Sequence, residues 1–242
     1  MKRTVLITGA SGSIGGALAK SFALAGDSVI LHYNNSKAEC EELCAMINGS
    51  GYSAESIMAD LCSDNDIKSL VDFAVERDVD VLINNAGVSD TMLFTDESTQ
   101  NIDRVILTNL TSVIKLTRLI LPHMIRKKSG CIINISSVWG ECGASCEVVY
   151  SAAKAGIIGF TKALAKEVAP SGVRVNCISP GVIRSRMLNE HSEETLADLQ
   201  KNIPLNRLGE PNDISGCARF LASPSADYIT GEVIRVNGGF YI

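Results

Sequence analysis

The sequence predicts an α/β fold with a doubly wound, mostly parallel sheet of about seven strands, in a single domain spanning residues 1–242. Short apolar runs near residues 3, 28, 53, 79, 130, 172 and 232 alternate with stretches of helical periodicity. This alternation is typical of right-handed βαβ crossovers. The chain has 242 residues, 46% of them hydrophobic, which suits one domain with a sizeable core and leaves no room for a second.

The first strand is predicted over Thr4–Ile7 and is followed by a glycine-rich turn and by a helix that runs to about Ala25. The turn reads Thr8-Gly9-Ala10-Ser11-Gly12-Ser13-Ile14-Gly15. Glycines let such a turn close tightly and let a pyrophosphate approach the backbone, while the helix N-terminus presents unpaired N–H groups. Any α/β protein can contain a tight turn, but its place after the first strand favours a dinucleotide site of the Rossmann type.

The second predicted strand ends in a polar segment without an acid, His32-Tyr33-Asn34-Asn35-Ser36-Lys37. A carboxylate here would accept hydrogen bonds from the ribose 2′-hydroxyl of NAD and would repel a 2′-phosphate. Amide and hydroxyl groups and one cation instead favour NADP(H), with Asn34, Ser36 and Lys37 as candidate phosphate contacts. A plain polar loop is the alternative.

Polar residues also follow two later strands. Asn84-Asn85-Ala86-Gly87 follows the apolar strand Asp80–Ile83, and Ser137 follows the strand Cys131–Ser136. In open parallel sheets the ligand crevice lies beyond the carboxyl ends of the strands. Ordinary turn chemistry explains either segment alone, but their combination with the glycine turn predicts a site.

Tyr150 and Lys154 lie four residues apart in Val148–Phe160, whose apolar spacing predicts a helix, so both side chains leave the same helical face. A phenol titrates near ~10, and a nearby cation favours the phenolate. We therefore expect Lys154 to lower the pKa of Tyr150 and Tyr150 to act as a general acid. Alone, such a pair is more typical of a solvated surface, but the three preceding features favour catalysis.

With these residues together, the chain resembles the short-chain dehydrogenase/reductase family over essentially its whole length. The resemblance implies a catalytic tetrad of Asn109, Ser137, Tyr150 and Lys154, with Asn109 on the long helix after the Asn-Asn-Ala-Gly turn. It implies hydride delivery from a reduced nicotinamide to a carbonyl, to which Ser137 donates a hydrogen bond and Tyr150 a proton. Lys154 would also hold the nicotinamide ribose, and Asn109 would anchor a water that refills the proton path.

The resemblance also implies the cofactor contacts. Pro180-Gly181, after the strand Arg174–Ser179, would border the nicotinamide, and Asp60-Leu61 would hold the adenine. The family's C-terminal signature matches Asn237-Gly238-Gly239. The expected contacts are Gly9, Ser11, Ser13, Ile14, Gly15, Asn34, Ser36, Lys37, Asp60, Leu61, Asn85, Ala86, Gly87, Tyr150, Lys154, Pro180, Gly181 and Ile183. Ser13 replaces the second glycine of the family's turn, so we expect a slightly altered pyrophosphate loop that still binds.

Two substrate classes follow from the resemblance. The whole chain is most similar to 3-oxoacyl-acyl-carrier-protein reductases, whereas residues 138–147 resemble the branch that reduces the 5-aminopentanone modification on a lysine of elongation factor P. Glu147 and Trp139 suit a cation, because a carboxylate attracts an ammonium and an indole adds cation–π attraction. Alternatively, Glu147 caps the helix that carries Tyr150. The expected substrate contacts are Ser137, Trp139, Glu147 and Tyr150.

The resemblance extends to partners and moving parts. It assigns docking of the acidic acyl-carrier protein at the site mouth to Lys128, while Ser171 occupies the family's second basic position. The polar segment 184–204 is expected to form a mobile substrate lid, or else a plain surface connection. The family commonly forms homotetramers through its long central helices and C-terminal strand. A silent NADP-binding scaffold is a further alternative, which the intact tetrad disfavours.

Charge and composition exclude several classes. A net charge of −5 argues against general nucleic-acid binding. No apolar stretch is expected to reach the roughly 20 residues of a membrane span, so we expect a cytoplasmic protein. The spacing of the eight cysteines and three histidines matches no metal site, and the cysteines are expected to be free buried thiols, including Cys62 and Cys217 beside apolar runs.

Overall fold

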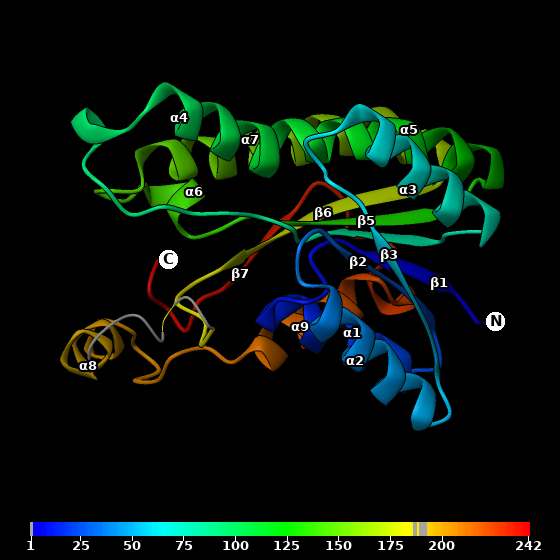
Figure 1. The fold of residues 1–242 in the computed structure, drawn as a ribbon, viewed down its shortest axis with the longest axis horizontal. Helices are drawn as coiled ribbons and strands as arrows, with labels where there is room; N and C mark the ends of the chain where they lie inside the picture. The colour runs from blue at the N-terminus through cyan, green and yellow to red at the C-terminus, as the bar shows by residue number, and fades with distance from the viewer. Residues whose placement is uncertain (1, 186–187, 189–192) are drawn as a thin grey trace.

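The computed structural model describes residues 2–185, 188 and 193–242 (Figure 1). Its strands form one sheet in the order β3-β2-β1-β4-β5-β6-β7, and every neighbouring pair is parallel. The strands are β1 (Thr4–Ile7), β2 (Ser28–Tyr33), β3 (Ser53–Met58), β4 (Val81–Asn84), β5 (Gly130–Ile135), β6 (Val173–Pro180) and β7 (Val233–Val236). The predicted doubly wound sheet is confirmed.

Helices cover both faces of this sheet (Figure 1). One layer contains α1 (Ser13–Leu24), α2 (Lys37–Gly49) and α9 (Pro211–Leu221). The other contains α3 (Asp64–Glu76), α4 (Thr99–Ile106), α5 (Ser112–Lys127) and α7 (Val148–Val168). Two further helices, α6 (Trp139–Cys142) and α8 (Glu193–Lys201), belong to connections that follow β5 and β6.

The core lies on both faces of the sheet because successive strand side chains point in opposite directions. Val5 and Ile7 of β1 pack in one cluster with Phe22 of α1, while Leu6 between them packs in the other cluster with Ile120 of α5. All five side chains are fully buried. Strands buried on both faces read as continuous apolar runs, which is why the sequence located them.

Among the residues that the structure describes, two helical stretches have the length and hydropathy of membrane spans, contrary to the expectation that none approaches that length. They are Thr99–Lys127 and Val148–Ser171. In the fold their inner faces pack on the sheet, where Leu116 and Ile120 of α5 and Val168 of α7 are buried. Their apolar residues therefore contribute to the core between helices and sheet.

The cysteines are all free, as expected, but they are not all buried. Cys40, Cys131 and Cys177 are buried, whereas Cys62 and Cys142 are exposed. The expectation of buried thiols is wrong at these two positions, and the remaining three, Cys44, Cys146 and Cys217, are only half-buried. Cys62 lies in the turn between β3 and α3 and Cys142 ends the short helix α6, so neither faces the core.

The strand order reverses direction between β1 and β4, which lie side by side although five elements separate them along the chain. Connections leave these two strands toward opposite sides of the sheet. A crevice forms at the carboxyl ends of strands where the order reverses, and such crevices bind ligands in open α/β sheets. The glycine turn and the Asn-Asn-Ala-Gly segment both begin at this point.

Candidate functional site

The turn between β1 and α1 requires glycine at two positions. Gly9 has a φ of +64°, and a Cβ there would lie 2.9 Å from the Cα of Ala86. A Cβ on Gly15 would overlap the carbonyl oxygen of Gly9. Helix α1 begins at Ser13, and its N-cap residue Gly12 forms no side-chain capping bond. Its first N–H groups therefore remain for a ligand, and this close-packed cradle fits a dinucleotide pyrophosphate.

Thr8 joins this turn to the segment after β4. Its hydroxyl oxygen accepts hydrogen bonds from the backbone N–H groups of Asn85 at 2.9 Å and Ala86 at 3.0 Å. The Asn85 side-chain amide donates to the carbonyl oxygens of Thr8 and Gly9 at 2.9 and 3.2 Å. The structure thus brings Asn85, Ala86 and Gly87 to the glycine turn. Thr8 opens the glycine motif, but its bridging role depends on contacts with a distant segment that the motif does not reveal.

The end of β2 presents polar side chains next to the glycine turn. Asn34 and Lys37 are exposed, and Ser36 is the N-cap of α2 but makes no side-chain capping bond. The Lys37 ammonium lies 3.6 Å from Glu41 in an exposed pair, which is a weak interaction. These three groups fit an anion at a helix N-terminus.

The turn after β3, the strand that pairs with β2, contains the next two predicted contacts. Asp60 accepts a hydrogen bond from the backbone N–H of Cys62 at 2.9 Å, and Leu61 is buried. The site residues Asp60 and Leu61 predicted from the sequence therefore lie in a hydrogen-bonded turn after the carboxyl end of β3, which pairs with β2.

Asn109 lies in a single π-helical turn, Leu107–Thr111, inserted between α4 and α5. Its buried side chain accepts from the backbone N–H of Val88 at 3.1 Å and donates to the carbonyl oxygens of Val88 at 2.8 Å and Val105 at 2.9 Å. Asn109 thus fixes the segment after β4 to the helix. The sequence placed Asn109 on a long helix but did not reveal the π turn, a feature frequent at functional sites.

Ser137, Tyr150 and Lys154 meet beyond the end of β5. The Lys154 side chain is buried, and its ammonium donates to the carbonyl oxygen of Ile135 at 2.9 Å. Ser136 donates to the Lys154 carbonyl oxygen at 2.8 Å and so fixes α7 to β5. The Ser137 hydroxyl oxygen accepts from the backbone N–H of Trp139 at 3.2 Å.

Gly87 locates Asn109 relative to Lys154. A Cβ on Gly87 would lie 2.6 Å from the Asn109 side-chain oxygen and 3.5 Å from the Lys154 ammonium nitrogen. Both groups therefore border the same backbone position. The structure brings all four predicted tetrad residues to one region at the carboxyl ends of β4 and β5.

The ionisation of the pair differs from the sequence-based expectation. Burial raises the pKa of Tyr150 to about 12; a hydrogen bond with Ser137 lowers it and the charge of Glu147 raises it further. Burial lowers the pKa of Lys154 to about 8. The Tyr150 pKa is therefore raised rather than lowered, contrary to the expectation, because desolvation of the phenol outweighs the stabilisation that a nearby cation gives to the phenolate.

Glu147 precedes α7 and faces the same region as Tyr150. It occupies the N-cap position, yet its side chain forms no capping bond. One of its carboxylate oxygens instead accepts from the Ser89 hydroxyl at 3.1 Å. Glu147 thus lies at the helix N-terminus, as the capping alternative expects, but without a side-chain hydrogen bond to the helix.

Trp139 is half-buried and packs edge-to-face on Phe240, with ring centres 5.4 Å apart. The C-terminal segment therefore supports the short helix that follows Ser137. A neighbouring pair adds to this support, since Arg235 of β7 contacts Glu141 of α6 at 2.7 Å.

Lys128 does not border the site within one chain. It ends α5 in a left-handed conformation with a φ of 53°, just before β5 begins. Gly172 packs against its carbonyl group, so Ser171 is also close to it. Both positions lie at the amino ends of the strands, whereas Ser137 follows the carboxyl end of β5. The expectation of Lys128 at the site mouth is wrong for the single chain, because α5 runs antiparallel to the strands.

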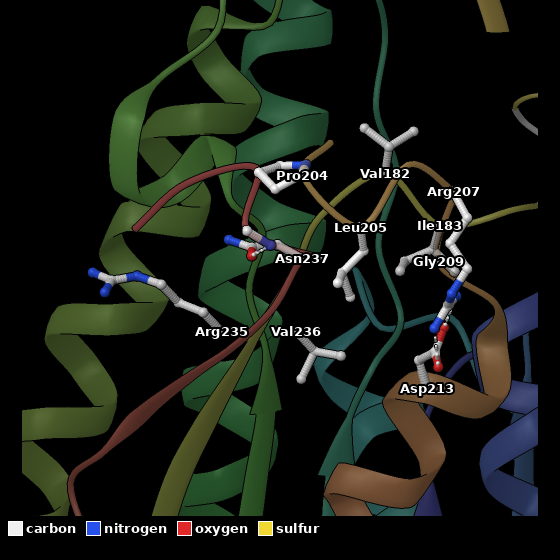
Figure 2. Close-up of a pocket in the computed structure, with 12 residues that line it drawn as sticks. Val182, Ile183, Pro204, Leu205, Arg207, Gly209, Asp213, Arg235, Val236 and Asn237 are labelled. Carbon is white, nitrogen blue, oxygen red and sulfur yellow. Dashed lines mark hydrogen bonds and ion pairs between the residues drawn. The ribbon is translucent and has the colours of Figure 1, made fainter. Parts of the chain in front are cut away.

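A cavity of about 520 Å³ adjoins the turn after β6 (Figure 2). It lies between Val182 and Ile183 on one side and the C-terminal signature with Asn237 on the other, while Leu205 points into the space between them. The Gly181 N–H donates to the carbonyl oxygen of Val236 at 3.0 Å, which closes this turn against β7. None of the four tetrad residues lines the cavity.

The predicted lid, 184–204, falls partly outside the described residues, at 186–187 and 189–192. Its described part contains α8, and Ile203 near its end is buried. Its beginning is fixed by the backbone N–H of Arg184, which donates to the carbonyl oxygen of Gly209 at 2.8 Å. The role as a lid stays a prediction.

Comparison with known proteins shows similarity over the full length. A family model described as enoyl-(acyl carrier protein) reductase matches residues 9–241. A Bacillus subtilis protein named uncharacterized oxidoreductase YmfI is 40% identical over 242 residues, covering all of both chains. The 3-oxoacyl-[acyl-carrier-protein] reductases FabG of Staphylococcus epidermidis and Aquifex aeolicus are 39% identical over 244 residues and 40% identical over 241 residues. The first covers all of both chains, and the second covers 98% of this chain and 96% of its own.

Proposed function

The chain belongs to the short-chain dehydrogenase/reductase family, whose members are oxidoreductases acting on CH–OH and C=O groups, and on this premise we propose that it uses NADPH to reduce a ketone that carries an ammonium group. The 5-aminopentanone on a lysine of elongation factor P is such a ketone. The observation that carries ketone reduction is the convergence of Asn109, Ser137, Tyr150 and Lys154 at the carboxyl ends of β4 and β5.

Three of the four side chains have a direct role in the reduction. The reduced nicotinamide supplies the hydride when it is bound. Ser137 donates a hydrogen bond to the substrate carbonyl oxygen, and Tyr150 donates the proton that completes the alcohol. With a pKa of about 12, Tyr150 holds this proton throughout the neutral range. Lys154 places a cation 5.5 Å from the Tyr150 ring, where it favours the phenolate that forms as the proton leaves.

NADP(H) is supported by the polar end of β2. From His32 to Lys37 there is no acid that would repel a 2′-phosphate, and Lys37 supplies a cation. Ser36 at the start of α2 adds a hydroxyl that is not used in capping. The glycine turn before α1 would hold the pyrophosphate, because the close packing at Gly9 and Gly15 leaves no room for side chains there.

An ammonium on the substrate is supported by Glu147 and Trp139. Glu147 occupies the N-cap position of the helix that carries Tyr150, and its charge raises the pKa of Tyr150. Ser89 orients this carboxylate by a hydrogen bond at 3.1 Å. An ionised acid next to the site attracts an ammonium, whereas a neutral acyl chain gains nothing from it.

A second candidate is a 3-oxoacyl-acyl-carrier-protein reductase of fatty-acid synthesis. Two relatives with this name match almost the whole chain at 39% and 40% identity. The chain retains one cation, Lys128, and has Ser171 at the second docking position, which weakens attraction to an acidic carrier. A silent NADP-binding scaffold has less support, since it has no need of the assembled tetrad.

A homotetramer is also proposed. Ile114 and Ile125 on α5 are 37% and 38% exposed, and β7 forms an edge of the sheet. A second copy packed on these surfaces would cover apolar side chains and an unpaired strand edge. Light scattering during gel filtration tests this, and a monomeric mass would contradict it.

Substrate choice is tested by following NADPH oxidation with three compounds: a δ-amino ketone, a 3-oxoacyl thioester and an enoyl thioester. Each is measured with the wild type, with Glu147→Gln and with the control Glu167→Gln, which removes an exposed acid from the other end of α7. We expect turnover of the amino ketone, lost in Glu147→Gln and kept in the control. Efficient thioester reduction that Glu147→Gln leaves unchanged would instead identify a fatty-acid-synthesis reductase. NADPH binding without turnover of any ketone would support the scaffold.

A further inference from the structure

His32 connects the ends of three strands beneath the glycine turn. It is 2% exposed, near the end of β2. Its Nδ1 accepts a hydrogen bond from the backbone N–H of Gly9 at 3.1 Å, and its Nε2 lies 2.9 Å from the carbonyl oxygen of Ala59. The His32 carbonyl oxygen also accepts from the backbone N–H of Ala10 at 2.9 Å. One residue thus holds the first two positions of the turn after Thr8.

These partners allow only one form of the ring. Gly9 offers an N–H, so Nδ1 must be unprotonated, and Ala59 offers a carbonyl oxygen, so Nε2 must carry the hydrogen. The neutral Nε2–H tautomer satisfies both. The imidazolium has two N–H groups and no acceptor, so protonation would set the Nδ1–H against the N–H of Gly9.

Gly9 has no room to adjust to such a change. Its φ of +64° and its contact with Ala86 fix its backbone between His32 on one side and the segment after β4 on the other. Displacing its N–H by a fraction of an ångström would move the turn that leads into α1. A ligand held by the first N–H groups of α1 depends on that geometry.

We propose that His32 is a positioning residue for the cofactor turn, which it holds in the binding conformation only while its ring is neutral. The inference rests on the proposed binding of NADP(H) at this turn. Acid would then weaken cofactor binding through one buried ring, without unfolding the chain.

The environment of the ring agrees with this role. Burial lowers the pKa of His32 from its ordinary value of 6.5, while the hydrogen bond to Ala59 and the charge of Asp60 on the neighbouring loop oppose that shift. The ring is therefore neutral at physiological pH. A lowered pKa means that the folded chain binds the proton less readily than the unfolded chain. The stabilisation by the neutral His32 ring is therefore complete above pH 6.5, and it is lost as pH falls from there through the lowered pKa of the folded chain.

The test measures the dissociation constant of NADPH by its fluorescence between about pH 4.5 and about pH 8. For the wild type we expect affinity to fall as pH decreases, approaching about tenfold per pH unit below the pKa of His32. The ring signals of His32, followed by NMR in the free protein, should titrate over the same interval. They are assigned by their loss in His32→Gln.

Variants distinguish the effect of the His32 ring on NADPH affinity from the effects of other titrating groups. His32→Gln keeps one acceptor and one donor but does not titrate, so its affinity should retain only the pH dependence of the cofactor's 2′-phosphate. His32→Phe lacks the acceptor and should bind NADPH about tenfold more weakly near neutral pH, with kcat at saturating cofactor nearly unchanged. His123→Gln is the control, because His123 pairs with Asp78 at the amino ends of the strands, and should behave as the wild type.

Four results would overturn the inference. A pH profile of His32→Gln identical to that of the wild type would place the responsible proton elsewhere. Wild-type affinity in His32→Phe would show that the ring does not position the turn, and if that variant fails to fold, the comparison of wild type with His32→Gln decides. Failure of the wild type to bind NADPH at any pH would overturn the proposed cofactor as well, whereas binding with a flat profile overturns only the role of His32.

Discussion

The Lys154 ammonium nitrogen lies 5.5 Å from the centre of the Tyr150 ring, while its hydrogen bond goes to the carbonyl oxygen of Ile135 at 2.9 Å. The cation is thus anchored to the end of β5. Burial raises the pKa of Tyr150 to about 12 and lowers that of Lys154 to about 8. Tyr150 therefore keeps its proton at neutral pH, which suits proton donation during reduction better than proton removal during oxidation.

Removing the Tyr150 hydroxyl tests its role as the acid. We expect Tyr150→Phe to lose about 10²- to 10⁴-fold in kcat, because a positioned acid contributes that much. The dissociation constant of NADPH should stay close to the wild-type value, since the ring remains in place. Steady-state kinetics and fluorescence titration measure the two quantities. Wild-type turnover in this variant would refute the assignment.

The rate of ketone reduction should fall as pH rises through about 8. Lys154 loses its proton there, and with it the charge that stabilises the departing phenolate. Tyr150 stays protonated over that interval, so the decline reports Lys154 alone. The measurement is kcat against pH at saturating NADPH. A decline centred near the ordinary lysine value of 10.5 would show that burial does not shift this group.

Replacing the buried cation should stabilise the fold while it abolishes activity. Below about pH 8 the folded chain holds a charge that the unfolded chain exposes to water, and the shift from 10.5 to about 8 corresponds to roughly 3 kcal/mol. Lys154→Met removes this penalty but leaves the Ile135 carbonyl oxygen without its donor, at a cost of about 1 kcal/mol.

The net gain in free energy of unfolding should therefore be about 1–2 kcal/mol near neutral pH. This gain should shrink between about pH 8 and pH 10.5. Over that interval the folded wild-type chain holds Lys154 in its neutral form, so the cost of burying the charge declines as pH rises. Urea denaturation at both ends of this interval measures it. A variant less stable than the wild type near neutral pH would contradict the prediction.

Gly87 should tolerate no side chain. Gly87→Ala would set a Cβ 2.6 Å from the Asn109 side-chain oxygen, so Asn109 must move and its bonds with Val88 must weaken. We expect a loss of about 1–3 kcal/mol in stability and a drop in kcat. The control is Gly159→Ala on α7, where nothing lies within 4 Å and helix propensity predicts a gain of about 0.5–1 kcal/mol. Equal effects of the two substitutions would count against the close packing at Gly87.

Lys37 should contribute to the choice of NADPH over NADH. Lys37→Glu places a carboxylate beside the expected 2′-phosphate and should weaken NADPH binding by about tenfold or more, with little effect on NADH. Lys68→Glu makes the same charge change at an exposed position on α3 and serves as the control. The ratio of the two dissociation constants is the readout. An unchanged ratio in Lys37→Glu would remove Lys37 from the phosphate site.

The strands and the glycine turn could be predicted because their causes are local. β1 reads as an apolar run since its residues are buried on both faces of a parallel sheet, and Gly9 is demanded by the turn itself. The absence of an acid at the end of β2 is likewise visible in a short run of adjacent residues. The tetrad positions followed from resemblance to a family whose motifs recur at fixed places along the chain.

The partners of these residues could not be predicted in the same way. The π turn at Asn109 leaves no mark in composition or spacing. The bond from Ser89 to Glu147 joins residues 58 positions apart, and the contacts of His32 with Gly9 and Ala59 join three strands. The distance of Lys128 from the site followed from the direction of α5, which the sequence of that helix does not encode.

By itself, then, the sequence determined the alternation of strands and helices, the two glycine positions of the turn and the set of polar side chains that follow the strands. Only the tertiary structure decided how those side chains ionise and which of them meet. The reason is physical: desolvation of Tyr150 and Lys154 comes from atoms contributed by several elements, and its size depends on packing in three dimensions rather than on the four-residue spacing that brings the pair together.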